Sequence, residues 1–236
     1  MKRLTFALFG LLLLALVAVP ASAGVVWDNT NGFTNNFNVQ AWTINFGFEV
    51  ADSFTFGSNT NVQGVDFWVQ EPLPATGGHA DDMTQVDWAI VNNDGTGGNP
   101  FTGSTMVVSG TVSTSGVFMG TSGLGLDVYE ESFATGGVAL GAGTYWLILQ
   151  NAVSSSGNPI YWDQSDGPSA AYENTIGDLT NCGGTSDSPD APGTTCSETF
   201  DLTGTSDVTT PEPGSLMLFG SGMLLLAGAL RRKASR

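Results

Sequence analysis

The chain has 236 residues and a formal net charge of −16, because 22 acidic residues stand against six Lys and Arg. All six cationic residues lie at the two ends, and residues 24–210 contain neither Lys nor Arg. Such a body cannot neutralise phosphates, which excludes nucleic-acid binding and also nucleotide binding through a P-loop lysine. With a single His it offers few groups for acid–base or nucleophilic catalysis, so we expect no enzyme activity.

Residues 1–23 have the features of a secretory signal peptide. Lys2 and Arg3 supply the positive start, and the apolar run 6–19 that follows is too short to span a membrane comfortably. Ala21-Ser22-Ala23 is a small-residue cleavage site. We therefore expect the exported protein to begin at Gly24.

Between residues 24 and 208, apolar residues recur at every second position, which is the pattern of half-buried β-strands. The segments with this pattern are 42–50, 54–56, 65–69, 86–90, 106–112, 126–128, 138–140, 145–149, 160–162 and 200–202. Residues 145–149 are apolar on both faces, which is typical of a central strand. Gly-rich turns separate the segments, and Gly141-Ala142-Gly143 has the features of a hairpin turn.

These segments predict an all-β fold, an antiparallel jelly-roll-like β-sandwich that forms one extracellular domain over residues 24–208. A parallel β-helix is the alternative, but the sequence contains no repeat of fixed period to support it.

All six Trp lie in this body, and they suggest a carbohydrate ligand if some of them are exposed. Large aromatic side chains are usually core residues in a sandwich, so we expect at least four of the six to be buried. Trp68 and Trp146 lie on the strand face opposite the main apolar series, which makes them the candidates for stacking on sugar rings. A carbohydrate-binding module is therefore one alternative function.

Acidic residues in predicted turns suggest a structural Ca²⁺, because hard cations take carboxylate and carbonyl oxygens from loops. None of these residues has the spacing of an EF-hand loop, and acids in turns are also ordinary turn chemistry. The candidate ligands are Asp81, Asp82, Asp94, Asp163 and Asp166.

A carboxylate-dependent glycoside hydrolase is a further alternative, since that chemistry requires only two suitably spaced acids. Asp81 with Asp82, and Glu130 with Glu131, are the candidate pairs. Neighbouring acids in a strand point to opposite faces, however, which favours a structural interpretation. His79 is accompanied by neither a Gly-x-Ser-x-Gly nor a His-Glu-x-x-His motif.

Cys182 and Cys196 are the only cysteines, and the segment between them is rich in Gly, Ser, Thr and Pro. In an exported chain, two cysteines this close in sequence favour a disulfide. A metal site would require further ligands of a suitable kind, and the single His is distant in sequence.

The C-terminal segment, residues 209–236, has three parts. Pro211-Glu212-Pro213 is followed by the uncharged apolar run 214–230 and then by the basic tail 231–236, which begins with Arg231 and Arg232. Seventeen apolar residues are at the lower limit for a transmembrane helix, and the basic tail should stay in the cytoplasm.

This order of parts resembles the PEP-CTERM sorting signal. The resemblance implies that an exosortase recognises the tail and cuts near Pro211-Glu212-Pro213, after transient anchoring in the cytoplasmic membrane, so that the protein reaches the cell surface or the extracellular space. It also implies a Gram-negative bacterium that makes exopolysaccharide. Ice binding, which is associated with similar tails, would require regularly spaced Thr that this sequence lacks.

Parts of the body are similar to a recurrent sandwich domain of PEP-CTERM proteins, which implies the same fold. The similar segments are residues 50–56, 86–90, 140–147 and 200–204. We therefore expect an exported, non-catalytic protein of the cell surface or extracellular matrix, with a structural or adhesive role linked to exopolysaccharide. The expected partner is the exosortase, with an exopolysaccharide as a further candidate. We expect no cofactor, and a structural Ca²⁺ is the alternative.

Overall fold

A computed structural model describes residues 23–30, 41–74, 77–92, 100–165, 167–175, 178–181 and 197–207. These residues form strands and connections, and none of them belongs to a helix that is long and apolar enough to cross a membrane. The predicted membrane helix 214–230, the predicted disulfide partners Cys182 and Cys196, and residues 1–22 of the predicted signal peptide lie outside the described residues.

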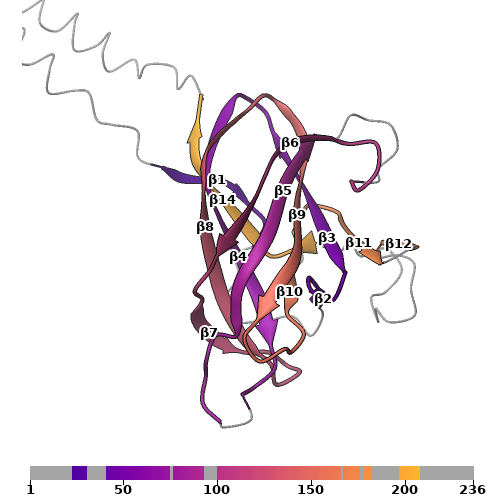
Figure 1. Ribbon diagram of the computed structural model, residues 1–236. Helices are drawn as coiled ribbons and strands as arrows, with labels where there is room; N and C mark the ends of the chain where they lie inside the picture. The colour runs from indigo at the N-terminus through magenta and orange to yellow at the C-terminus, as the bar shows by residue number, and fades with distance from the viewer. Residues whose placement is uncertain are drawn as a thin grey trace, which may run out of the picture. The chain divides into compact units, whose positions relative to one another are not determined.

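The described strands form two sheets in which every pairing is antiparallel, as predicted (Figure 1). The larger sheet contains β1 (Gly24–Asp28), β2 (Ala41–Thr43), β4 (Thr60–Glu71), β7 (Val117–Thr121), β8 (Asp127–Leu140), β10 (Tyr161–Ser165), β13 (Ser197–Glu198) and β14 (Phe200–Ser206). The smaller sheet has the order β12 (Asp178–Asn181), β11 (Ala171–Thr175), β3 (Glu49–Phe56), β9 (Gly143–Ser154), β5 (Met83–Asn92) and β6 (Thr105–Ser113). The two-sheet fold is consistent with a β-sandwich, whereas its jelly-roll connectivity stays a prediction.

Strand β4 organises the larger sheet because it is long enough to pair with two strands along one edge. On one side it pairs with β8 from Thr60 to Glu71. On the other side, β14 lies opposite residues 60–67 and β10 lies opposite residues 69–70. Strands β14 and β10 therefore follow one another along β4.

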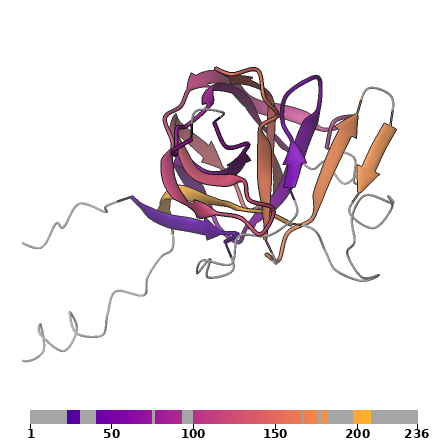
Figure 2. The ribbon, with the colours of Figure 1, turned by 90° about the horizontal axis from the view of Figure 1, so that it is seen from below.

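The two sheets enclose one aromatic-rich core, around which they curve in the view of Figure 2. Phe54 and Leu147 contribute to it from the smaller sheet, and Phe67, Trp162 and Phe200 contribute from the larger one. Each of these side chains is at most 1% exposed. Because the burial of apolar area contributes about 25 cal/mol per Å², this core supplies the main driving force for folding.

Strand β9 is the central strand that the sequence predicts, since it pairs with β3 on one side and β5 on the other. Both faces of β9 are apolar because each packs against a different hydrophobic cluster. Leu147 and Leu149 face the main core, whereas Trp146 and Ile148 belong to a second cluster that Phe101 and Tyr172 partly cover.

The predicted hairpin at residues 141–143 is wrong. Strand β8, before this turn, pairs with β4 and β7, whereas β9, after it, pairs with β3 and β5. Gly141-Ala142 therefore carries the chain from one sheet to the other. A short Gly-rich turn permits either connection, and only the packing of the two sheets decides between them.

Two other sequence patterns also take a different form in the structure. The predicted strand 42–50 is interrupted, because Phe46 and Gly47 have φ values of 58° and 89° and turn the chain between β2 and β3. Gly136-Gly137, which the sequence places between two strands, instead lies within β8, where the register with β4 shifts. Such a bulge requires positive φ values, which glycine adopts without strain.

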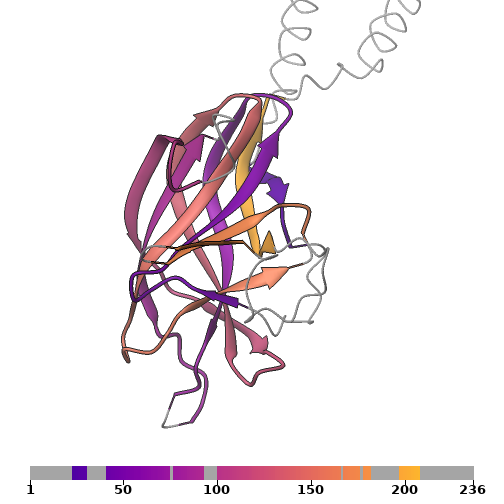
Figure 3. The same cartoon turned by 90° about the vertical axis from the view of Figure 1, so that its right-hand side faces the viewer.

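The connection between β4 and β5 lies at the same end of the sandwich as β7 (Figures 1 and 3). This end contains the group of acidic side chains described next.

Candidate functional site

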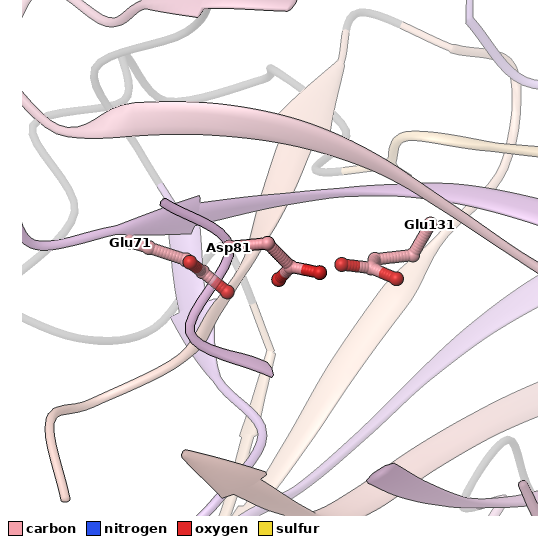
Figure 4. Close-up of side chains that lie close together, drawn as sticks. All are labelled: Glu71, Asp81 and Glu131. Atoms are coloured by element: carbon pink, nitrogen blue, oxygen red, sulfur yellow. The ribbon is translucent and has the colours of Figure 1, made fainter. Parts of the chain in front are cut away.

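Three acidic side chains meet at this end of the sandwich. Glu71 is the last residue of β4, Asp81 lies in the connection to β5, and Glu131 lies in β8. One carboxylate oxygen from each lies within 4.8 Å of the other two. Figure 4 shows the carboxylates of Asp81 and Glu131 pointing toward one another.

The alternation of the strands carries both glutamates into the interior. Glu131 follows the buried Tyr129 and precedes the buried Phe133 on the inward face of β8, and Glu71 continues the inward series of Phe67 and Val69 on β4. Side chains two residues apart lie on the same face of a strand. Glu71 and Glu131 are consequently both 0% exposed, at positions where apolar residues would continue the core.

Backbone N–H groups hold two of the three carboxylates in place. Glu71 accepts hydrogen bonds from the N–H groups of Asp82 and Met83, with N–O distances of 2.7 and 3.0 Å. Asp81 accepts from the N–H groups of Met83 and Gly116, at 3.1 and 2.6 Å. These bonds fix the connection between β4 and β5 against the residues that precede β7.

The third carboxylate, that of Glu131, differs from the other two. Among the described residues, neither of its oxygens has a hydrogen-bond partner. Burial raises the pKa of Glu131 to about 9. The charge of Asp81, the close approach of its carboxylate, with which a protonated Glu131 can share its proton, and the charge of Glu71 add to this effect. The Thr114 hydroxyl lowers this pKa from nearby, without a hydrogen bond of normal geometry.

Burial also raises the pKa of Glu71 to about 7, although hydrogen bonds from the N–H groups of Asp82 and Met83 oppose the increase. The neighbouring Asp81 charge raises it further. The pKa values of Glu71 and Glu131 are raised for the same two reasons. Removal from water and the nearby negative charges both make ionisation of a carboxyl group less favourable. Protons or a cation must therefore compensate the charge of this group.

Gly116 allows the three acids to approach one another. A Cβ atom at this position would lie 2.4 Å from Oε1 of Glu131 and 2.9 Å from Cβ of Tyr129. Any larger residue would therefore displace Glu131 or the backbone that donates to Asp81.

An exposed aromatic pair lies next to this group. The His79 ring stacks on the Phe118 ring with centroids 3.9 Å apart, and its Nδ1 lies 2.9 Å from the buried carboxylate of Asp127. Phe118 in turn contacts Tyr129 edge to face, at 5.7 Å between centroids. The charges of Asp127, Glu71 and Asp81 contribute to a raised Tyr129 pKa, after burial as the main cause, so the rings and the acids belong to one neighbourhood.

Asp82, a second predicted calcium ligand, has a different role from its neighbour Asp81. Its carboxylate accepts hydrogen bonds from Ser154, Ser155 and Ser156, including the Ser156 N–H at 2.7 Å. Burial alone would raise the pKa of Asp82, but these hydrogen bonds outweigh it and lower the pKa. Asp82 therefore caps the turn that follows β9.

The predicted ligand Asp163 lies in a separate buried network, where its Oδ1 accepts a hydrogen bond from Gln70. Burial raises the pKa of Asp163 to about 7, and that of the nearby Glu198 well above its ordinary value. Asp163 therefore does not join Asp81. The remaining candidates, Asp94 and Asp166, lie outside the described residues, so their role stays a prediction.

A further buried network links the two sheets through Asn29. Its Nδ2 lies 3.0 Å from Oδ2 of Asp52 in β3, 2.7 Å from Ser169, 2.6 Å from Ser197 in β13 and 2.7 Å from the Glu198 carbonyl. An amide has two hydrogens for these four acceptors, so the bonds are shared. The network joins the residue after β1 to strands of both sheets, and its role is structural.

The predicted carboxylate pairs for glycoside hydrolysis are separated in the structure. Glu131 is buried, whereas Glu130 is partly exposed on the opposite face of β8. Asp81 and Asp82 are directed to different partners, as described above. Neither pair therefore brings its two carboxylates together.

The predicted glycan platform on Trp68 and Trp146 is wrong, because these side chains are only 6% and 4% exposed. Trp146 stacks edge to face on Tyr172 in the second apolar cluster. Four of the six Trp are buried, as expected, but the two candidates are among them. For Trp146, the sheet face that appears outward from the sequence is partly covered by Phe101 and Tyr172.

Sequence reasoning missed Glu71 and assigned Glu131 only to a catalytic pair. One signal was present, since both glutamates continue an inward apolar series where a charge is costly. Among the described residues, Asp81 is the one predicted calcium ligand that belongs to the group.

Comparison with known families places the C-terminal segment. Residues 209–233 match the PEP-CTERM protein-sorting motif, which includes the predicted Pro211, Glu212, Pro213, Arg231 and Arg232. No curated protein matches the chain. The motif indicates an exported surface protein that an exosortase recognises and processes.

Proposed function

Because the chain carries a PEP-CTERM protein-sorting motif, we propose that its β-sandwich is a non-catalytic component of the cell surface or the extracellular matrix, with a structural or adhesive role linked to exopolysaccharide. The motif at residues 209–233 is the observation that carries the proposal. The transient membrane anchor is assigned to residues 214–230, which precede the basic tail.

The burial of the acidic group supports a non-catalytic role. A glycoside hydrolase needs two carboxylates that flank the substrate, one of them ionised in most mechanisms. Glu71 and Glu131 are both 0% exposed, and burial raises the pKa of each to 7 or above. A sugar ring could reach neither carboxylate without opening the end of the sandwich.

The charge of the body fits a protein that stays soluble outside the cell. With no Lys or Arg between residues 24 and 210, the body remains strongly acidic once both ends are removed. Such a surface keeps the protein soluble and repels other anions. Contact with an acidic polysaccharide would then require aromatic stacking or bridging cations.

Carbohydrate binding through another surface is the second candidate function, and the His79–Phe118 pair favours it. Both rings are partly exposed, and the side chain of His79 is 48% exposed. Stacked rings at the rim of the sandwich offer the flat apolar surface that Trp68 and Trp146 do not provide. Leu73 and Met119, from the neighbouring segments, are also exposed.

Affinity electrophoresis in gels that contain the host's exopolysaccharide tests the adhesive role. We expect the exported protein to be retarded, Phe118→Ala to lose the retardation, and Leu124→Ala, which changes an exposed residue outside the ring pair, to keep it. No retardation of the unchanged protein would refute the link to polysaccharide. Mass spectrometry of the protein from its host tests processing, which would be contradicted if residues 214–236 persist.

A further inference from the structure

The carboxylate of Glu131 lacks the compensation that a buried charge requires. It is 0% exposed, it points at Asp81, and among the described residues it has no hydrogen-bond partner (Figure 4). A buried, unpaired carboxylate costs several kcal/mol, so such groups are normally paired or coordinate a metal ion. A structure that retains this residue needs a partner for it.

No cationic side chain can be that partner. The body contains no Lys or Arg, and its single His places its Nδ1 at Asp127. Three carboxylates within 4.8 Å of one another therefore have only protons or a bound cation for compensation.

The spacing of the oxygens fits a calcium ion. Ca²⁺–oxygen distances are about 2.3–2.6 Å, so two ligands on opposite sides of the ion lie up to about 5.2 Å apart. The carboxylate oxygens of Glu71, Asp81 and Glu131 meet this limit without movement. Mg²⁺ binds at about 2.1 Å and usually keeps several waters, which suits a site with two wholly buried glutamates less well.

The surrounding chain holds the ligands as a binding site requires. Backbone N–H groups of Asp82 and Met83 orient Glu71, and that of Gly116 orients Asp81. Each carboxylate oxygen keeps a second lone pair for an ion. The side-chain hydroxyls of Thr114 and Tyr129 are also buried beside the group, and neither makes a hydrogen bond of normal geometry with a described residue.

We propose that Glu71, Asp81 and Glu131 bind one Ca²⁺, which joins the β4–β5 connection and strand β8 at this end of the sandwich. The ion replaces the missing internal cations of the body. Calcium-binding modules outside the cell have dissociation constants of about 10⁻⁴–10⁻³ M. With an affinity of this size, the site would bind calcium after export, and the bound ion would stabilise the exported protein.

Thermal unfolding of the exported protein, as the host processes it, tests the proposal. Calcium at about 100-fold above its Kd should raise the Tm by about 5–10 °C relative to excess chelator, and calorimetric titration should give one ion per chain. A Tm that is the same in calcium and chelator would overturn the proposal, as would an equal effect of Mg²⁺ or a stoichiometry other than one.

Matched variants assign the ion to these residues. Glu131→Gln keeps the shape of the side chain and should abolish the calcium-dependent shift in Tm, whereas Glu130→Gln, on the opposite face of the same strand, should retain it. Glu71→Gln should also abolish the shift and serves as the second test if Glu131→Gln does not fold. A full calcium shift in either Glu71→Gln or Glu131→Gln would overturn the assignment.

Discussion

The substitution Asp163→Asn should remove the contribution that the Asp163 carboxyl makes to the pH dependence of stability. Asp163 is 0% exposed, and its Oδ1 accepts a hydrogen bond from Gln70, which an Asn carbonyl can replace. Burial raises the Asp163 pKa from 3.8 to about 7, although hydrogen bonds from Gln70 and the Gln164 backbone oppose it. The folded protein therefore holds a proton that the unfolded chain releases.

This difference in proton binding determines whether stability rises or falls with pH. As the pH rises from about 4 to about 7, the unfolded state loses the Asp163 proton and the folded state keeps it, so the free energy of unfolding falls. At about 1.4 kcal/mol per pH unit, the loss amounts to about 4 kcal/mol. Asn cannot ionise, so the variant should gain about this much relative to the unchanged protein between pH 3.5 and pH 8.

Urea unfolding at pH 3.5 and pH 8, followed by Trp fluorescence, measures this gain. The adjacent Trp162 is wholly buried and should report the transition. Asp207→Asn, at an exposed position, is the control and should show no such gain. If the difference in unfolding free energy between Asp163→Asn and the unchanged protein is the same at both pH values, the argument from burial is refuted.

Three further substitutions test the packing around the described networks. Gly116→Ala should lower stability by about 1–3 kcal/mol in thermal unfolding, because its Cβ would lie 2.4 Å from Oε1 of Glu131. Gly57→Ala is the control and should not lower stability, since the space around Gly57 is open. Equal effects of the two substitutions would contradict the close approach of Gly116 to Glu131. Asn29→Ala should cost about 1–3 kcal/mol in urea unfolding, since it removes a buried donor that acceptors of both sheets share, and a neutral result would refute the structural role of that network. Trp162→Phe removes a wholly buried indole and its hydrogen bond to the Thr199 carbonyl, so it should cost about 2–4 kcal/mol by the same measurement, and a loss below 1 kcal/mol would contradict the packing.

The sequence predicted the fold class because strand formation leaves a local record. Alternating apolar residues follow from the period of two in a strand, and they located β4, β5, β9 and β14. The double-sided apolar series 145–149 likewise predicted a central strand, which is the position of β9. The sorting segment was also readable, because a short linear signal does not depend on folding.

The sequence did not predict which strands pair with one another. Gly141-Ala142-Gly143 is compatible with a hairpin or with a crossing between sheets, and the local sequence does not distinguish them. Gly136-Gly137 is similarly compatible with a turn or a bulge. These choices depend on which faces bury apolar area together, which is a property of the whole sandwich.

The acidic body, residues 24–210, shows the same difference between what the local sequence and the tertiary structure determine. The sequence alone determined that residues 24–210 lack Lys and Arg, so any buried carboxylate must be compensated without a salt bridge to those residues. Only the tertiary structure decided which carboxylates are buried, and that Glu71, Asp81 and Glu131 meet across separate segments. The physical reason for this difference is that the net charge depends only on which residues the chain contains. The desolvation of a carboxylate and its distance from other ligands arise only when distant strands pack together.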